Sequence, residues 1–113
     1  MGMGLITDIE SLEWESVRPD VARDVLGKLL LRSEGIKMVL TKILPGGGFE
    51  THRDAYGHLL YFLEGSGIVG VGSEEFSIKP GLVVQVMAGE AHFYRNNSGK
   101  ELTLISANIT VEP

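Results

Sequence analysis

The strongest structural signal in this 113-residue chain lies in two glycine-rich stretches, GGGFETHRDAYGHLLYFLEGSG (residues 46–67) and GLVVQVMAGEAHFYRN (residues 81–96). Both stretches place short apolar runs between glycine-containing turns, a pattern that favours short strands over helices. All three histidines of the chain lie within them. The two stretches therefore predict β-structure and place the candidate chemistry in the same part of the sequence.

The strand pattern continues on both sides of these stretches. Apolar runs of strand length recur at even spacing, and the chain's 15 glycines fall largely between them. Such a series indicates an all-β sandwich or barrel, and the length allows one core, which we expect over residues 21–113. The expected strands are residues 25–32, 36–44, 49–54, 58–63, 68–71, 75–78, 82–87, 91–96 and 102–111.

Residues 1–20 form a polar, acidic extension before this domain. Ile6, Ile9 and Leu12 could share one face of a short helix, or the segment could lie as an edge strand. Trp14 is the expected packing anchor. We expect the extension to pack on the barrel or on a partner subunit.

Charge and composition exclude several classes of partner. The chain has 10 basic and 15 acidic residues, a net charge of −5, and its basic residues are scattered. A nucleic-acid interface needs a clustered cationic surface, so we expect no nucleic-acid partner. No apolar run is long enough to span a membrane, and no membrane partner is expected. The absence of cysteine excludes disulfides and fits a cytoplasmic protein.

The three histidines have a context that suggests a metal site. His52 and Asp54 are two residues apart, so on a strand their side chains share a face. His58 opens the next expected strand, where a hairpin brings it beside that pair. His92 follows a later turn. Three imidazoles and one carboxylate suit a divalent transition metal such as Fe, Mn, Zn, Ni or Cu.

The spacing of these residues resembles the first motif of the cupin family. That motif runs Gly, five residues, His, one residue, His, three or four residues, Glu, six residues and Gly. This chain has Gly46, His52, Asp54, His58 and Gly65 at the matching positions. Asp54 thus stands where the family usually has its second histidine, and His58 stands where it usually has glutamate.

The second stretch resembles the second cupin motif. That motif runs Gly, five residues, Pro, one residue, Gly, two residues, His, three residues and Asn. The matching residues here are Gly81, Met87, Gly89, His92 and Asn96, with methionine in place of proline. The resemblance implies a jelly-roll β-barrel.

The resemblance also implies a metal held by His52, Asp54, His58 and His92. Because the aspartate side chain is shorter than that of histidine, Asp54 either ligates the metal or orients one of the imidazoles. The alternative is a cupin barrel that has lost its metal.

A small-molecule pocket is expected beside the metal. Alternation along the strands from His58 and His92 places Leu60, Phe62 and Tyr94 on the metal side. The resemblance to cupins implies that Leu104, Ser106 and Asn108 lie there too. Alternatively, the side chains of Leu60, Phe62 and Leu104 fill the core. Tyr94 is the candidate proton donor or acid/base group.

Three functions remain open from the sequence. The resemblance implies a metal-dependent dioxygenase, a non-redox isomerase or lyase, or a binding or sensing module without catalysis. Small cupins commonly pair, and an apolar outer face of Val39, Leu59, Tyr61 and Leu63 predicts a homodimer.

Overall fold

The computed structural model describes residues 4–110, and residues 1–3 and 111–113, at the ends of the expected extension and barrel, lie outside the described part. The expectation of an all-β fold is confirmed, because the described residues hold strands and a single 3₁₀ turn. The elements are η1 (Ile9–Ser11), β1 (Glu15–Ser16), β2 (Ala22–Ser33), β3 (Ile36–His52), β4 (Gly57–Glu64), β5 (Gly67–Val71), β6 (Glu74–Ile78), β7 (Val83–Val86), β8 (His92–Arg95) and β9 (Leu102–Ile109). No helix within residues 4–110 is long and apolar enough to cross a membrane.

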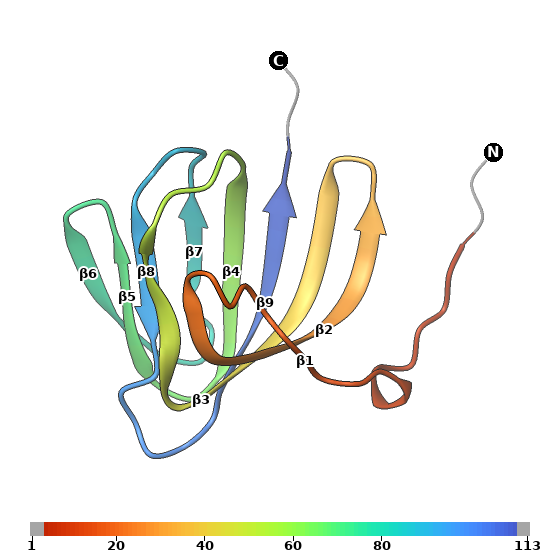
Figure 1. The fold of residues 1–113 in the computed structure, drawn as a ribbon, viewed down its shortest axis with the longest axis horizontal. Coiled ribbons are helices and arrows are strands. Elements are labelled where there is room, and N and C mark those ends of the chain that lie inside the picture. Colours follow the sequence, from red (N-terminus) through yellow and green to blue (C-terminus); the bar gives the residue numbers. More distant parts are fainter. Residues whose placement is uncertain (1–3, 111–113) are drawn as a thin grey trace.

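The strands form one curled antiparallel sheet (Figure 1). The hydrogen-bonded order is β6-β5-β8-β3-β9-β4-β7, and β2 pairs with both β1 and β3. The curl encloses an apolar core to which nearly every strand contributes. The buried core residues are Val25, Ile43, Phe49, Leu60, Phe62, Val69, Ile78, Val86, Tyr94, Leu102 and Leu104.

Strand β3 passes without interruption through the run Pro45–Gly48, where the sequence predicted a turn between two strands. On one side β3 pairs with β9 up to Ile43 and with β8 from Gly48 onward. A Cβ at Gly48 would lie 2.5 Å from the carbonyl oxygen of Tyr94, so the close approach of β3 and β8 requires glycine there. The glycine run therefore bends a strand between two neighbours and does not end it.

Asn96 holds the junction at which β3 changes neighbour. Its backbone exchanges hydrogen bonds with Gly46 and Gly47, at 2.9 and 2.8 Å. Its side chain, 1% exposed, donates to the carbonyl oxygens of Ile43 (3.0 Å) and Lys100 (2.6 Å). The asparagine of the second motif thus fixes the bend of the first.

The N-terminal extension packs on the chain's own barrel. Of the two expected forms, a short helix and an edge strand, it has a single 3₁₀ turn at Ile9–Ser11 and then the two-residue strand β1, which pairs with β2 at Leu26 and Gly27. The Nζ atoms of Lys28 and Lys42 lie 4.8 and 4.2 Å from the ring centroid of Trp14. Two cation–π contacts and the β1–β2 pairing attach this segment to the sheet.

Replacing Asn96 tests the junction. We expect Asn96→Ala to lower the free energy of unfolding by about 1–3 kcal/mol, because the buried carbonyl of Ile43 loses a hydrogen bond from the side chain. Asn97→Ala, at the exposed neighbouring position, is the matched control. Urea unfolding monitored by Trp14 fluorescence measures both, and equal stability of the two variants would contradict this role.

Candidate metal centre

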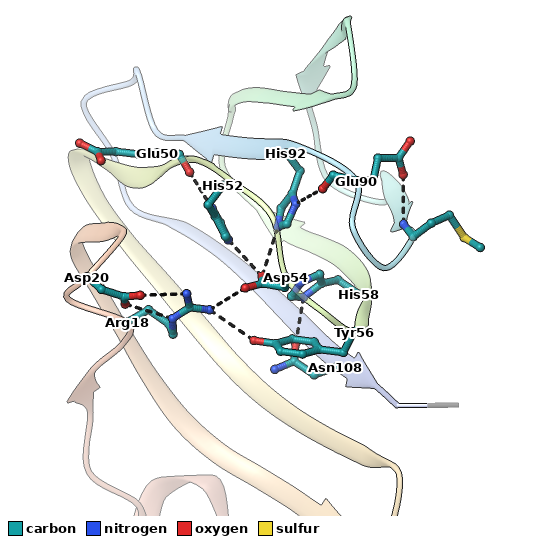
Figure 2. A network of polar contacts seen from close by, with 11 residues as sticks. Arg18, Asp20, Glu50, His52, Asp54, Tyr56, His58, Glu90, His92 and Asn108 are labelled. Carbon is teal, nitrogen blue, oxygen red and sulfur yellow. Dashed lines mark hydrogen bonds and ion pairs between the residues drawn. The ribbon is translucent and has the colours of Figure 1, made fainter. Parts of the chain in front are cut away.

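Three imidazoles surround one carboxylate oxygen at the end of β3 (Figure 2). The Nε2 atoms of His58, His52 and His92 lie 2.9, 3.2 and 3.7 Å from Asp54 Oδ2. The ligand atoms of His52, Asp54 and His92 all lie within 4.8 Å of one another. The structure thus brings the four expected ligand residues together around Asp54.

The opposite nitrogen of each imidazole is held by an oxygen. Nδ1 of His52 lies 2.6 Å from the carbonyl oxygen of Glu50, and Nδ1 of His92 lies 2.9 Å from that of Glu90. Nδ1 of His58 lies 3.0 Å from Oδ1 of Asn108. A carbonyl oxygen only accepts, so these contacts place a proton on Nδ1 of His52 and His92 and leave a lone pair on Nε2 of each neutral ring. Nε2 of His58 lies 2.9 Å from Asp54 Oδ2 and donates to that carboxylate in the metal-free protein.

This donor set fits a divalent cation. Each Nε2 atom faces the same carboxylate oxygen, so a proton or a cation must lie between them, and one metal ion would serve all four groups at once. In a tetrahedral or octahedral site with bonds of about 2.1 Å, neighbouring ligand atoms are about 3.0–3.4 Å apart. The separations of Asp54 Oδ2 from Nε2 of His58 and His52, 2.9 and 3.2 Å, are near this range, and the separation from Nε2 of His92 is longer, at 3.7 Å. Oxygen partners at Nδ1 are the usual way in which proteins orient metal-binding imidazoles.

Strand register explains how these residues meet. His52 on β3 is directly opposite His92 on β8, and His58 on β4 is directly opposite Asn108 on β9. Asp54 follows β3 in a loop that is tied to the turn before β8, since the carbonyl of Asp54 accepts from Gly89 N–H at 2.7 Å. The two sequence motifs therefore converge through sheet pairing.

Arg18 completes the site from the N-terminal extension. Its Nη1 donates to Asp54 Oδ1 at 3.2 Å and to the hydroxyl of Tyr56 at 3.3 Å. Its Nε and Nη2 donate to the two carboxylate oxygens of Asp20, at 3.1 and 3.0 Å. Arg18 therefore holds one oxygen of Asp54 and leaves the other toward the histidines.

The surroundings of Asp54 and His92 shift their pKa values in the directions that favour metal binding. Burial favours a raised pKa at Asp54, but hydrogen bonds from Arg18 and His58 and the charge of His52 outweigh it, so the pKa of Asp54 is lowered. Burial lowers the pKa of His92. Metal binding requires an ionised carboxylate and neutral imidazoles, and both directions favour those states.

A cavity of about 90 Å³ adjoins the cluster. Of the six residues expected to line a pocket, Tyr94, Ser106 and Asn108 do so. Leu60, Phe62 and Leu104 are at most 1% exposed and belong to the core, the alternative considered for them above. They share the inward face, but the bulk of the neighbouring rings fills the space between them and the cluster: Phe49 and Tyr94 stack at 4.6 Å, and Phe62 meets Tyr94 edge-on at 6.2 Å.

The face of Val39 differs from the expectation. Val39 lines the cavity together with Lys37 and Thr41 and does not lie on the outer face. The pairing of β3 with β8 shifts register between Phe49 and His52. If every second residue back from His52 is placed on the cavity side, Val39 falls on the outer face. The register shift reverses this alternation in the first half of β3, so Val39 lies on the cavity side.

Three residues of the site were missed by sequence reasoning. Arg18 reaches Asp54 across 36 positions of the chain. Tyr56 lies in the turn before β4, where it contacts Arg18, and Lys37 lines the cavity from β3. The turn Arg18-Pro19-Asp20 was visible in the sequence, but no spacing pattern links it to Asp54.

The model of the family described as "Cupin domain" matches residues 39–108, more than half of the chain. The chain is a cupin. No curated protein matches it at a significant level.

Solved structures support the cupin fold. A predicted oxalate decarboxylase from Thermotoga maritima is 20% identical, with a TM-score of 0.84 over 95% of this cupin and all of that chain. The polyketide cyclase RemF from Streptomyces resistomycificus is 19% identical, with a TM-score of 0.85 over 98% and 82% of the two chains. The protein TT1209 from Thermus thermophilus is 28% identical, with a TM-score of 0.73 over 92% and 95%. These likenesses confirm the jelly-roll barrel.

Removing Arg18 tests how the cupin holds Asp54. We expect Arg18→Met to raise the pKa of Asp54, since it removes a hydrogen bond and a positive charge that favour the carboxylate. A depressed pKa stabilises the fold above the ordinary carboxyl pKa of about 3.9, and this contribution is lost as the pH falls through the folded value. The variant should therefore lose less stability on acidification than the wild type.

Carboxyl ¹³C NMR titration of the metal-free protein measures the pKa, and urea unfolding from pH 3 to 7 measures the stability. Arg23→Met, which removes an exposed arginine, is the control. An unchanged pKa of Asp54 in Arg18→Met would show that the 3.2 Å contact has no energetic role.

Proposed function

We propose that this cupin is a metal-dependent enzyme that acts on a small molecule. His52, Asp54, His58 and His92 would hold one divalent transition metal. The observation that supports this most directly is the convergence of three imidazole Nε2 atoms on Asp54 Oδ2, at 2.9–3.7 Å. The oxygen partners at each Nδ1 keep these nitrogens available as ligands.

The reaction we favour is a metal-dependent oxygenation of the dioxygenase type. A redox-active Fe, Mn or Cu ion would supply the electron chemistry that oxygen requires, and three imidazoles with a carboxylate suit such ions. The protein's part is to position the ligands and to limit access of water. Val17, Val39 and Phe49 supply an apolar lining on one side of the 90 Å³ cavity.

Tyr94 is the proposed proton donor in this site. It lines the cavity and is 5% exposed, and its ring stacks on Phe49 at a centroid distance of 4.6 Å. Burial raises the pKa of its phenol, so the group stays protonated at neutral pH. Tyr94 would therefore donate a hydrogen bond or a proton and would not act as a base.

A second candidate is a reaction without redox chemistry, such as an isomerisation or lyase step assisted by Lewis-acid polarisation. It is favoured by the two similar structures named a polyketide cyclase and a predicted oxalate decarboxylase. The two reactions differ in their need for oxygen. Activity that survives anaerobiosis and replacement of the metal by Zn²⁺ would support the second candidate, and ligand binding without turnover would contradict both.

Metal analysis tests the proposed site. We expect purified wild type to bind one divalent metal per chain, His92→Ala to lose it, and Asp54→Asn to weaken Co²⁺ affinity by about tenfold or more, since a charged oxygen is removed from the cluster. Inductively coupled plasma mass spectrometry and Co²⁺ absorption titration measure these changes. Glu74→Gln, an exposed carboxylate on β6, is the control. Equal metal content in wild type and His92→Ala would contradict the site.

The protein partner we propose is a second copy of this chain. Leu59, Tyr61 and Val83 are 38%, 45% and 56% exposed on the outer face of β4 and β7, and Tyr61 is directly opposite Val83. Exposed apolar side chains grouped in this way are typical of an interface. Pairing of two copies across it would cover these side chains.

Light scattering tests this pairing. We expect wild type at micromolar concentration to have twice the 12.3 kDa chain mass, and Tyr61→Glu to shift it toward the chain mass, because a buried unpaired charge opposes association. Phe76→Glu, which changes an exposed apolar side chain on the distant strand β6, is the control. A wild type of single chain mass would contradict the homodimer.

A further inference from the structure

A second cavity, of about 290 Å³, adjoins the one at the metal cluster. The two cavities share Lys37, Tyr56 and Asn108 as lining residues. Arg32 and Ser33, both exposed, line only the outer cavity. The outer cavity therefore borders the inner one and has surface residues in its lining.

Two cations lie opposite each other at the outer cavity. Arg32 on β2 and Lys37 on β3 are direct register partners, and both line the outer cavity. Like charges at directly opposite positions of a sheet destabilise it. Among residues 4–110 neither side chain forms an ion pair within the chain. Within the described part of the chain, the sheet thus carries a local repulsion that no ion pair relieves.

The charge of the outer cavity contrasts with that of the whole protein. The chain carries a net charge of −5, yet no acidic residue among residues 4–110 lines the outer cavity. The inner cavity has a single carboxylate, Asp54, whose oxygens face Arg18 and the histidines. The outer cavity is therefore locally cationic and attracts anions.

We propose that Lys37 and Arg32 bind the carboxylate of a small organic anion whose other end reaches the metal cluster. This names a substrate class and rests on the proposed function. An anion at this position relieves the Arg32–Lys37 repulsion, and the hydroxyl and amide groups of Tyr56 and Asn108 add hydrogen-bonding partners on its path. The inner cavity of about 90 Å³ limits the inner end to a few heavy atoms, since a water takes about 30 Å³.

Pyruvate and pyruvamide test this inference, since they have the same number of heavy atoms and differ in charge. We expect ¹H–¹⁵N NMR titrations of metal-loaded wild type to give an affinity for pyruvate at least about fivefold higher than for pyruvamide. The largest shifts should fall on β2 and β3 near Arg32 and Lys37. Lys37→Met and Arg32→Met should each remove most of this preference.

Lys37→Arg keeps the charge and should retain the preference for pyruvate. Lys79→Met makes the same change of net charge outside both cavities, and should bind pyruvate as the wild type does. An equal affinity for pyruvate and pyruvamide, or an unchanged preference in both methionine variants, would overturn the inference.

Metal content and a metal-free titration separate this inference from the proposed function. Wild type that binds no metal, but still prefers pyruvate in a manner that depends on Lys37, would contradict the proposed function and support the anion subsite. Wild type that binds one metal per chain with no preference for pyruvate would contradict the subsite alone.

Discussion

The site depends on one electrostatic constraint, the convergence of three imidazole Nε2 atoms on one carboxylate oxygen. Each ring is fixed from behind by an oxygen at Nδ1, which keeps its Nε2 directed toward Asp54. A proton or a cation must lie between these nitrogens and the carboxylate oxygen. A metal ion satisfies all of them at once, which is why the geometry favours a metal centre over a polar core.

The rest of the fold serves this convergence. Strand β3 must pair with β9 over its first half and with β8 over its second, because His52 is opposite His92 and His58 is held by Asn108 on β9. The glycine run makes the bend, and Asn96 fixes it. The N-terminal extension then brings Arg18 over Asp54, so the segment before the barrel is part of the site.

Much of this could be predicted from the sequence because spacing carries it. The turn spacing predicted the strands, and the two motifs predicted that His52, Asp54, His58 and His92 would meet. Arg18 and Lys37 could not be found this way, since their positions depend on tertiary packing. Because the register shifts between Phe49 and His52, alternation counted from His52 puts Val39 on the wrong face of β3. It also fails to identify Lys37 as a residue that lines the cavity.

Histidine protonation, observed by long-range ¹H–¹⁵N NMR while one equivalent of Zn²⁺ is added, tests the central claim most directly. The account predicts that His52, His58 and His92 all keep a proton on Nδ1 and that all three Nε2 resonances shift together on binding. A Zn²⁺-loaded protein in which Nε2 of any of these histidines carries the proton would contradict it.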